Sequence, residues 1–149
     1  MTTTVRQILE GKGKGKAIFA VSPSATVFEA LQCMQANDIG GVLVTEGEHL
    51  RGIFTERDYA RKVTLQGKAS KEIKVSEVMT ANVLTISPSQ TIDDVLEMMT
   101  ENRIRHLPVV EKGKMAGVIT IGDAVKAVIA EQKATIEHLE SYISGDLGN

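Results

Sequence analysis

A short polar motif, Gly-x-x-Thr-x-x-Asp, occurs twice in this sequence and carries the residue types best suited to chemistry. It ends at Asp58 in the first half of the chain and at Asp123 in the second. Each copy follows a short apolar run and precedes a predicted helix. A helix N-terminus presents free N–H groups that favour an anion. A carboxylate there can accept hydrogen bonds from both hydroxyl groups of a ribose, and the threonine can reach a phosphate.

The same motif also has a purely structural interpretation. A threonine at the N-cap with an acidic residue three positions later is a capping-box pattern, in which each side chain accepts a backbone N–H of the other residue. The chain has similar pairs at Thr26 with Glu29 and at Thr91 with Asp94. One threonine–aspartate pair can serve both purposes, so the residues alone leave both interpretations open.

The two motifs belong to an internal repeat that organises the chain. When the sequence is shifted by 65 residues, residues 21–60 align with residues 86–125 without a gap, and 13 of the 40 positions are identical. Each copy predicts a strand, a helix, a two-stranded hairpin and a second helix. The expected segments are strands at 18–21 and 83–86, helices at 26–37 and 91–102, hairpin strands at 42–44, 52–54, 107–110 and 117–119, and second helices from about Arg57 and Asp123.

This repeat predicts a mixed α/β fold of the α+β type, made of two β-α-β-β-α units. A unit of about 60 residues has a marginal core by itself, so the two copies are expected to depend on each other. We assign residues 1–65 to the first repeat with an N-terminal segment and 66–74 to a polar linker. Residues 75–130 form the second repeat, and 131–149 a C-terminal helix and tail.

The composition limits the classes of function. The chain has 149 residues, of which 42% are hydrophobic and 24% charged, with a net charge of −2. Disorder is excluded, and a nucleic-acid interface lacks the basic face that it needs. No signal peptide or membrane span is apparent, so we expect a cytoplasmic protein. Its single cysteine, Cys33, excludes an internal disulfide and is expected in the core.

We expect no enzymatic activity, no catalytic residue and no metal site. The three histidines are far apart in the sequence and the one cysteine is expected to be buried. Their spacing assembles no nucleophile, general base or metal cluster.

Two further segments allow more than one interpretation. Lys12, Lys14 and Lys16 alternate with glycines and predict a loop, which is either simply solvated or closes over the phosphates of a ligand. Ile129, Ile136 and Ile143 are spaced by seven residues on a predicted helix. Their shared face packs either on another chain or on its own domain.

The repeat resembles the cystathionine-β-synthase (CBS) domain, and the tandem pair resembles a Bateman module of the stand-alone type. The resemblance covers about residues 5–130. It is carried by Ser-Pro-x-x-Thr before the first helix of each copy, Asn-x-Ile after it, and Gly-x-x-Thr-x-x-Asp at the end. The resemblance implies pseudo-twofold packing of the repeats and two clefts that bind an adenosyl ligand: AMP, ADP, ATP, NAD(H) or S-adenosylmethionine. It also implies a homodimer of four repeats and a partner protein that responds to ligand binding.

The resemblance assigns residues from both repeats to each cleft. The first cleft would use Thr55, Arg57 and Asp58 with Val83, Thr85, Ile104, Arg105 and His106. The second would use Thr120, Gly122 and Asp123 with Ile18, Ala20, Ile39, Gly40, Gly41 and Val42.

The alignment of the repeats predicts that the two clefts differ. Gly40 and Gly41 align with Arg105 and His106, and Arg57 aligns with Gly122. The first cleft should therefore depend more on the phosphate charge of its ligand. A regulatory module that senses adenine nucleotides is the favoured function, and a protein-interaction module with empty clefts is the alternative.

Overall fold

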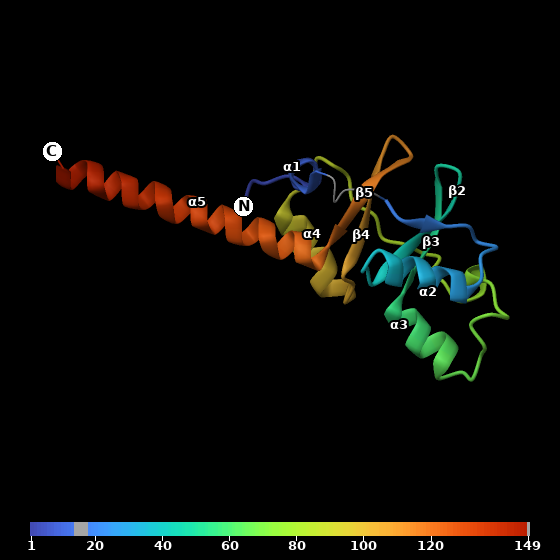
Figure 1. The fold of residues 1–149 in the computed structure, drawn as a ribbon. Coiled ribbons are helices and arrows are strands. Elements are labelled where there is room, and N and C mark those ends of the chain that lie inside the picture. Colours follow the sequence, from blue (N-terminus) through green and yellow to red (C-terminus); the bar gives the residue numbers. More distant parts are fainter. Residues whose placement is uncertain (14–17, 149) are drawn as a thin grey trace. The chain divides into compact units, whose positions relative to one another are not determined.

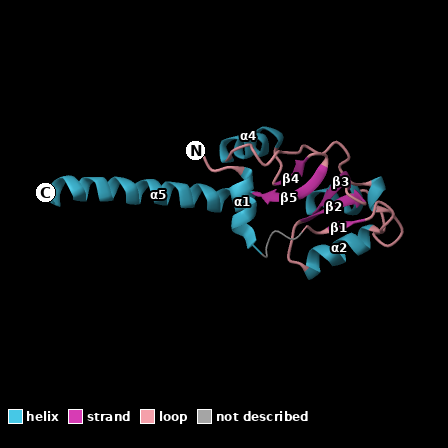
Figure 2. Cartoon of the chain, turned by 90° about the horizontal axis from the view of Figure 1, so that it is seen from above, coloured by secondary structure: helices cyan, strands magenta, loops and turns pink. Residues whose placement is uncertain are grey.

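The computed structural model of the protein describes residues 1–13 and 18–148. Figure 1 and Figure 2 show the order of its helices and strands. They are α1 (Val5–Lys12), β1 (Ala20–Val21), α2 (Val27–Ala36), β2 (Gly41–Glu46), β3 (His49–Thr55), α3 (Glu56–Asp58), a π-helical segment (Tyr59–Thr64), a 3₁₀ turn (Val75–Glu77), α4 (Ile92–Asn102), β4 (His106–Glu111), β5 (Lys114–Thr120) and α5 (Ile121–Gly148). The predicted mixed fold of the α+β type is confirmed.

The chain forms two compact units that do not follow the order of the sequence. One unit comprises Met1–Lys16, Ile86–Val109 and Val118–Asn149. The other comprises Ala17–Thr85 and Val110–Gly117. The N-terminal helix α1 therefore belongs to the same unit as α4 and α5, the helices of the second repeat.

The unit that contains residues 17–85 is built on a three-stranded sheet in the order β1-β2-β3. Strand β1 pairs parallel to β2, and β2 pairs antiparallel to β3. Thr26 caps α2 by accepting the N–H of Glu29 at 3.1 Å. The helix has apolar residues at i, i+3 and i+7, and this spacing places them on one face. The core consists of Val27, Ala30, Met34, Val42, Val44, Phe54, Val63, Val75 and Val78.

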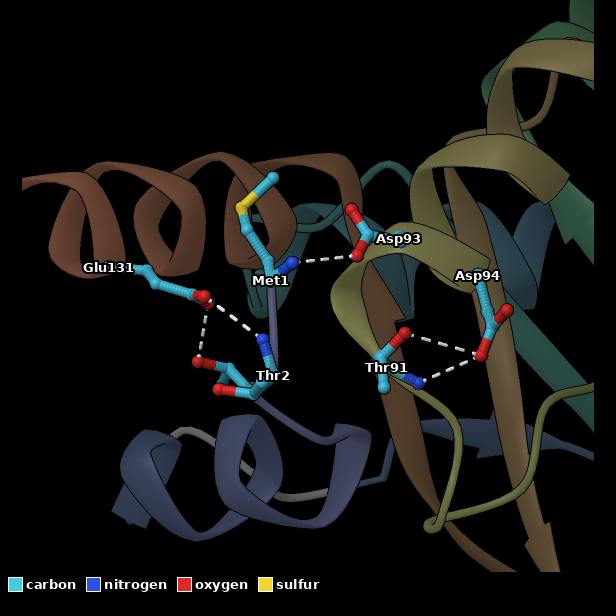
Figure 3. Close-up of polar contacts among 7 residues, drawn as sticks. Met1, Thr2, Thr91, Asp93, Asp94 and Glu131 are labelled. Atoms are coloured by element: carbon cyan, nitrogen blue, oxygen red, sulfur yellow. Dashed lines mark hydrogen bonds and ion pairs between the residues drawn. The ribbon is translucent and has the colours of Figure 1, made fainter. Parts of the chain in front are cut away.

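The unit that contains α5 is held together by apolar and polar contacts among segments distant in sequence. Its buried side chains include Val5, Ile8, Leu9, Ile86, Ile92, Val95, Met99, Leu107, Val109, Ile119 and Ala124. Figure 3 shows the polar contacts of the N-terminal residues with α4 and α5. The Met1 amine lies 3.0 Å from Asp93, and Glu131 accepts the Thr2 N–H at 3.0 Å and the Thr3 hydroxyl at 2.8 Å. These contacts attach the N-terminus to both helices.

The strand predicted at residues 83–86 is wrong, and a proline explains why. Only Ile86 pairs, through an isolated bridge to Val109 in which its N–H donates to the Pro108 carbonyl at 3.0 Å. In the first repeat, the Leu43 N–H donates to the Phe19 carbonyl at 3.1 Å, beside β1. Pro108 occupies the position of Leu43 in the second repeat and has no N–H to donate. The second parallel bond is therefore impossible there.

The loop predicted around Lys12, Lys14 and Lys16 is wrong at its first lysine. Lys12 is the last residue of α1, whose N-cap Thr4 and Gln7 form a capping box. Lys14 and Lys16 lie outside the described residues. The predicted C-terminal helix is also not separate from the second helix of the repeat, because α5 runs without interruption from Ile121 to Gly148.

Candidate functional site

Both copies of the motif begin a helix directly after a hairpin strand. The Thr55 N–H donates to Asp58 Oδ2 at 3.0 Å, and the Asp58 N–H donates to Thr55 Oγ1 at 3.2 Å. The corresponding distances for Thr120 and Asp123 are 2.9 Å and 3.2 Å. The capping-box interpretation is therefore confirmed in both repeats, and it fixes the orientation of both carboxylates.

The carboxylate of Asp58 is buried and has contacts at both oxygens. Its Oδ1 accepts the Thr80 hydroxyl at 3.1 Å and lies 3.0 Å from Lys62 Nζ, one helical turn away. Thr80 is positioned by two backbone hydrogen bonds with Ile53, of 2.9 and 3.0 Å. A cation and a hydroxyl thus neutralise and solvate the buried charge.

The carboxylate of Asp123 receives comparable contacts from one side chain. Lys12 Nζ donates to Asp123 Oδ2 at 2.8 Å and to the Val118 carbonyl at 2.9 Å. Val118 is the repeat counterpart of Ile53, and the counterpart of Lys62 is Ala127, which has no charge. The ammonium of Lys12 therefore takes over the roles that Lys62 and Thr80 share in the first repeat.

Neither of the ion pairs that Lys62 and Lys12 form with the two aspartates was predicted from the sequence. The spacing of Asp58 and Lys62 at i and i+4 was a usable signal for the first ion pair. The second ion pair joins residues 111 positions apart. No local pattern indicates such a contact.

The electrostatic environment keeps Asp123 ionised at neutral pH. Burial alone would raise the pKa of this carboxyl group, but the hydrogen bonds from Lys12 and from Thr120 outweigh it, so the pKa is lowered. Among residues 1–13 and 18–148, none donates a hydrogen bond to Asp123 Oδ1. This oxygen retains its capacity to accept a hydroxyl group.

The other predicted site residues are distributed over both units. The unit of residues 17–85 contains Thr55, Arg57, Asp58, Val83, Thr85, Ile18, Ala20, Ile39, Gly40, Gly41 and Val42. The other unit contains Ile104, Arg105, His106, Thr120, Gly122 and Asp123. Each predicted cleft draws on both units, so the two clefts stay predictions.

Within each unit, the backbone before a central strand lies beside a motif. The Gly40 carbonyl accepts the N–H of Glu56 at 3.0 Å, at the start of α3. The Arg105 carbonyl accepts the N–H of Ile121 at 2.9 Å, at the start of α5. The structure therefore brings Gly40 close to the first motif and Arg105 close to the second.

Val83 and Thr85 line a cavity of about 610 Å³ in the unit of residues 17–85. Its other lining residues are Glu46, Glu48, His49, Leu50, Arg51, Ala81, Val110, Gly113 and Met115. This is the end of β3 that begins at His49, whereas the motif follows the opposite end of that strand. The cavity lining does not include Thr55 or Asp58.

Within residues 1–13 and 18–148, no group of three or more His, Cys, Asp or Glu residues is arranged to hold a metal ion. None of the helices in these residues combines the length and apolar character needed to cross a membrane.

Comparison with known proteins identifies the repeats. The CBS domain model matches residues 15–64 and 75–130. The CBS domain-containing protein CBSX3, mitochondrial, of Arabidopsis thaliana is 36% identical, over 97% of this chain and 73% of the relative.

Two solved structures illustrate the structural similarity. A protein with CBS domains from Burkholderia ambifaria, named as a candidate signal-transduction protein, is 50% identical with a TM-score of 0.83, over 87% of this chain and 96% of that one. A hexameric CBS-CP12 protein from bloom-forming cyanobacteria is 25% identical with a TM-score of 0.73, over 84% and 67% of the two chains. The chain described here belongs to the CBS-domain family and carries two CBS domains in tandem.

Proposed function

We propose that this protein is a non-enzymatic regulatory module that binds an adenosyl ligand in the two clefts predicted from its sequence and transmits occupancy to a partner protein. Proteins with CBS domains are regulatory and signalling modules, which supports the general role. The observation that carries the ligand class is the carboxylate of Asp123. It is oriented by Thr120 at a helix start and retains an oxygen that none of the described residues engages.

The chemistry of this carboxylate suits a ribose. Asp123 Oδ1 can accept a ribose hydroxyl while Oδ2 keeps its contacts with Thr120 and Lys12. Asp58 would bind a ribose hydroxyl in the first cleft by exchanging the Thr80 or Lys62 contact at its Oδ1, with Arg57, Arg105 and His106 near the phosphates. AMP, ADP, ATP, NAD(H) and S-adenosylmethionine all contain the required ribose.

Lys12 modifies the expected difference between the clefts. It adds an ammonium group 2.8 Å from the carboxylate of the second cleft, which the sequence marked as the less cationic. We therefore expect the two clefts to differ less in their dependence on phosphate charge than the sequence predicts.

The proposal includes a homodimer of four CBS domains in the cytoplasm, with no role in nucleic-acid binding. Assembly occurs among similar folds, since the cyanobacterial CBS-CP12 protein is hexameric.

Titration calorimetry and thermal unfolding with AMP, ATP, NADH and S-adenosylmethionine test the ligand class. At a ligand concentration 100 times the dissociation constant, one site should add about 2.7 kcal/mol to the free energy of unfolding. If none of the four ligands releases binding heat or raises the melting temperature, the proposal is refuted.

Variants of the two carboxylates test the sites. Asp58→Asn and Asp123→Asn should each remove one binding event and keep the other. Asp94→Asn is the matched control, because Asp94 accepts the Thr91 N–H at 3.0 Å in a capping contact outside the two motifs. Loss of binding in this control would show that a damaged helix cap, and not a missing ribose contact, explains the result.

A further inference from the structure

The distal half of α5 has no covering from the rest of the described chain. Helices α1 and α4 pack against α5 near its start, and Figure 1 shows the helix extending beyond both of them. Every residue from 132 to 145 is exposed. An isolated helix of this length is marginal in water, and this one contains β-branched, serine and glycine residues that favour helix only weakly. The distal half therefore needs a partner to be a stable helix.

The exposed helix carries a regular apolar seam. The seam consists of Val125, Ile129, Gln132, Ile136, Leu139 and Ile143, with the alternating spacing of four and three residues that is typical of a coiled coil. Its five apolar members are each between 46% and 58% exposed. The sequence left open whether Ile129, Ile136 and Ile143 pack on their own domain. In the described part of the chain they do not.

We propose that the seam pairs with the same seam of a second copy of this chain, with the two helices antiparallel. In this arrangement Ile129 lies opposite the partner's Leu139, Ile136 opposite the partner's Gln132, and Ile143 opposite the partner's Val125. All six seam positions then have a counterpart. If the partner helix is shifted by seven residues in either direction, some seam positions have no counterpart on it.

The residues that flank the seam favour the antiparallel orientation. Lys126 then lies beside the partner's Glu140, and twofold symmetry repeats this contact. Val128 lies beside the partner's Tyr142, so apolar residues meet on the other flank. A parallel pair would place Val128 beside the partner's Lys133 and Thr135 beside the partner's Glu140, which joins no opposite charges. In the antiparallel pair, Lys133 on the same flank as Lys126 lies beside the partner's Lys133, one like-charge contact against the two Lys126–Glu140 contacts. The balance of charge and the apolar contacts indicate a second copy of the chain as the partner of this face.

Disulfide crosslinking of the full chain tests the orientation. Ile129→Cys and Leu139→Cys are made separately in a Cys33→Ser background and oxidised alone and as a mixture. The antiparallel pair predicts a crosslinked dimer that contains one chain of each variant. Crosslinking of each variant only with itself would overturn the antiparallel arrangement, and no crosslinking in any sample would overturn the pairing.

Amide hydrogen exchange tests whether pairing stabilises the distal half. The exchange rate of the amides of residues 132–145 should be at least about tenfold lower at high protein concentration than at low concentration. Ile136→Asp should abolish this protection. Ala134→Asp, on the opposite face of the same turn, introduces the same side chain and should retain it. Equal effects of the two substitutions, or fast exchange in the unmodified chain at all concentrations, would overturn the proposal.

The charged flank provides a third test. Lys126→Glu alone should weaken the protection of residues 132–145, and the added Glu140→Lys should restore it because the ion pair is reversed. A double variant weaker than the single one would contradict the proposed register. None of the three tests requires a ligand, so their outcome is independent of the proposed binding function.

Discussion

Replacing Lys12 by methionine tests the ion pair that the structure places at the second motif. The substitution removes the ammonium that contacts Asp123 and the Val118 carbonyl, while the methionine side chain preserves most of the apolar stem. Packing around the end of α1 should therefore change little. The main effect is on the charge and hydrogen bonds of Asp123.

The expected loss of stability follows from the burial of this pair. An exposed ion pair contributes about 0–1 kcal/mol, and a hydrogen bond to a charged group contributes about 1.5–3 kcal/mol. The side chains of Lys12 and Asp123 are only 19% and 16% exposed, at a separation of 2.8 Å. We expect Lys12→Met to lower the free energy of unfolding by about 1–2 kcal/mol at pH 7. For a chain of this size the melting temperature should fall by about 2–8 °C.

The effect should depend on pH in a definite direction. The pKa of Asp123 is lowered in the folded protein, so its stabilising contribution is complete above the ordinary carboxyl pKa, about 3.9, and is lost as the pH falls through the folded value. Without Lys12, burial raises the pKa of Asp123 with less opposition. The difference between the two proteins should be full near neutral pH and should shrink below about pH 4.

Urea unfolding at pH 7, 5 and 3 measures these differences. Lys114→Met is the matched control, because the pair of Lys114 and Glu48 is 3.4 Å long with side chains 67% and 69% exposed. Its loss should cost less than about 0.5 kcal/mol. A comparable loss in the control, or a cost of Lys12→Met that is as large at pH 3 as at pH 7, would refute the reasoning.

Two further substitutions have expected outcomes. Gly52→Ala should destabilise the protein by about 1–3 kcal/mol in urea unfolding, because a Cβ there would lie 2.6 Å from Met79 Sδ and 2.7 Å from the Thr80 carbonyl. Gly11→Ala lies in a helix with open space around it and should raise the free energy of unfolding by up to about 1 kcal/mol. A lower free energy of unfolding in Gly11→Ala would contradict the distinction between the crowded Gly52 and the open Gly11. Under the proposed function, Lys12→Met should leave the calorimetric affinity for adenosine at the second cleft nearly unchanged, because the ribose uses Asp123 Oδ1 whereas Lys12 contacts Oδ2. Clearly tighter binding would show that the ribose hydroxyls and Lys12 compete for the same oxygen.

The features that the sequence determined are those encoded within a few residues of one another. The apolar spacing within residues 26–37 and 91–102 predicted two helices, and the structure confirms both nearly to the residue as α2 and α4. The threonine–aspartate pairs predicted the capping boxes, whose partners are three positions apart. The repeat itself led to the family, because a duplicated motif is visible without any knowledge of the fold.

Tertiary structure decided the features that depend on contacts between distant segments. Pro108 has no backbone N–H. This matters only because the fold places Ile86 beside Pro108, where the segment before Ile86 would need that N–H to extend its parallel pairing. The C-terminal seam was visible as spacing, but only the exposure of residues 132–145 shows that their own domain leaves them uncovered. The pairing of Lys12 with Asp123 joins residues 111 positions apart, and a long-range ion pair leaves no periodicity in the sequence. Local periodicity specifies which face of an element is apolar, whereas the fold decides what covers that face and which charge lies beside each carboxylate.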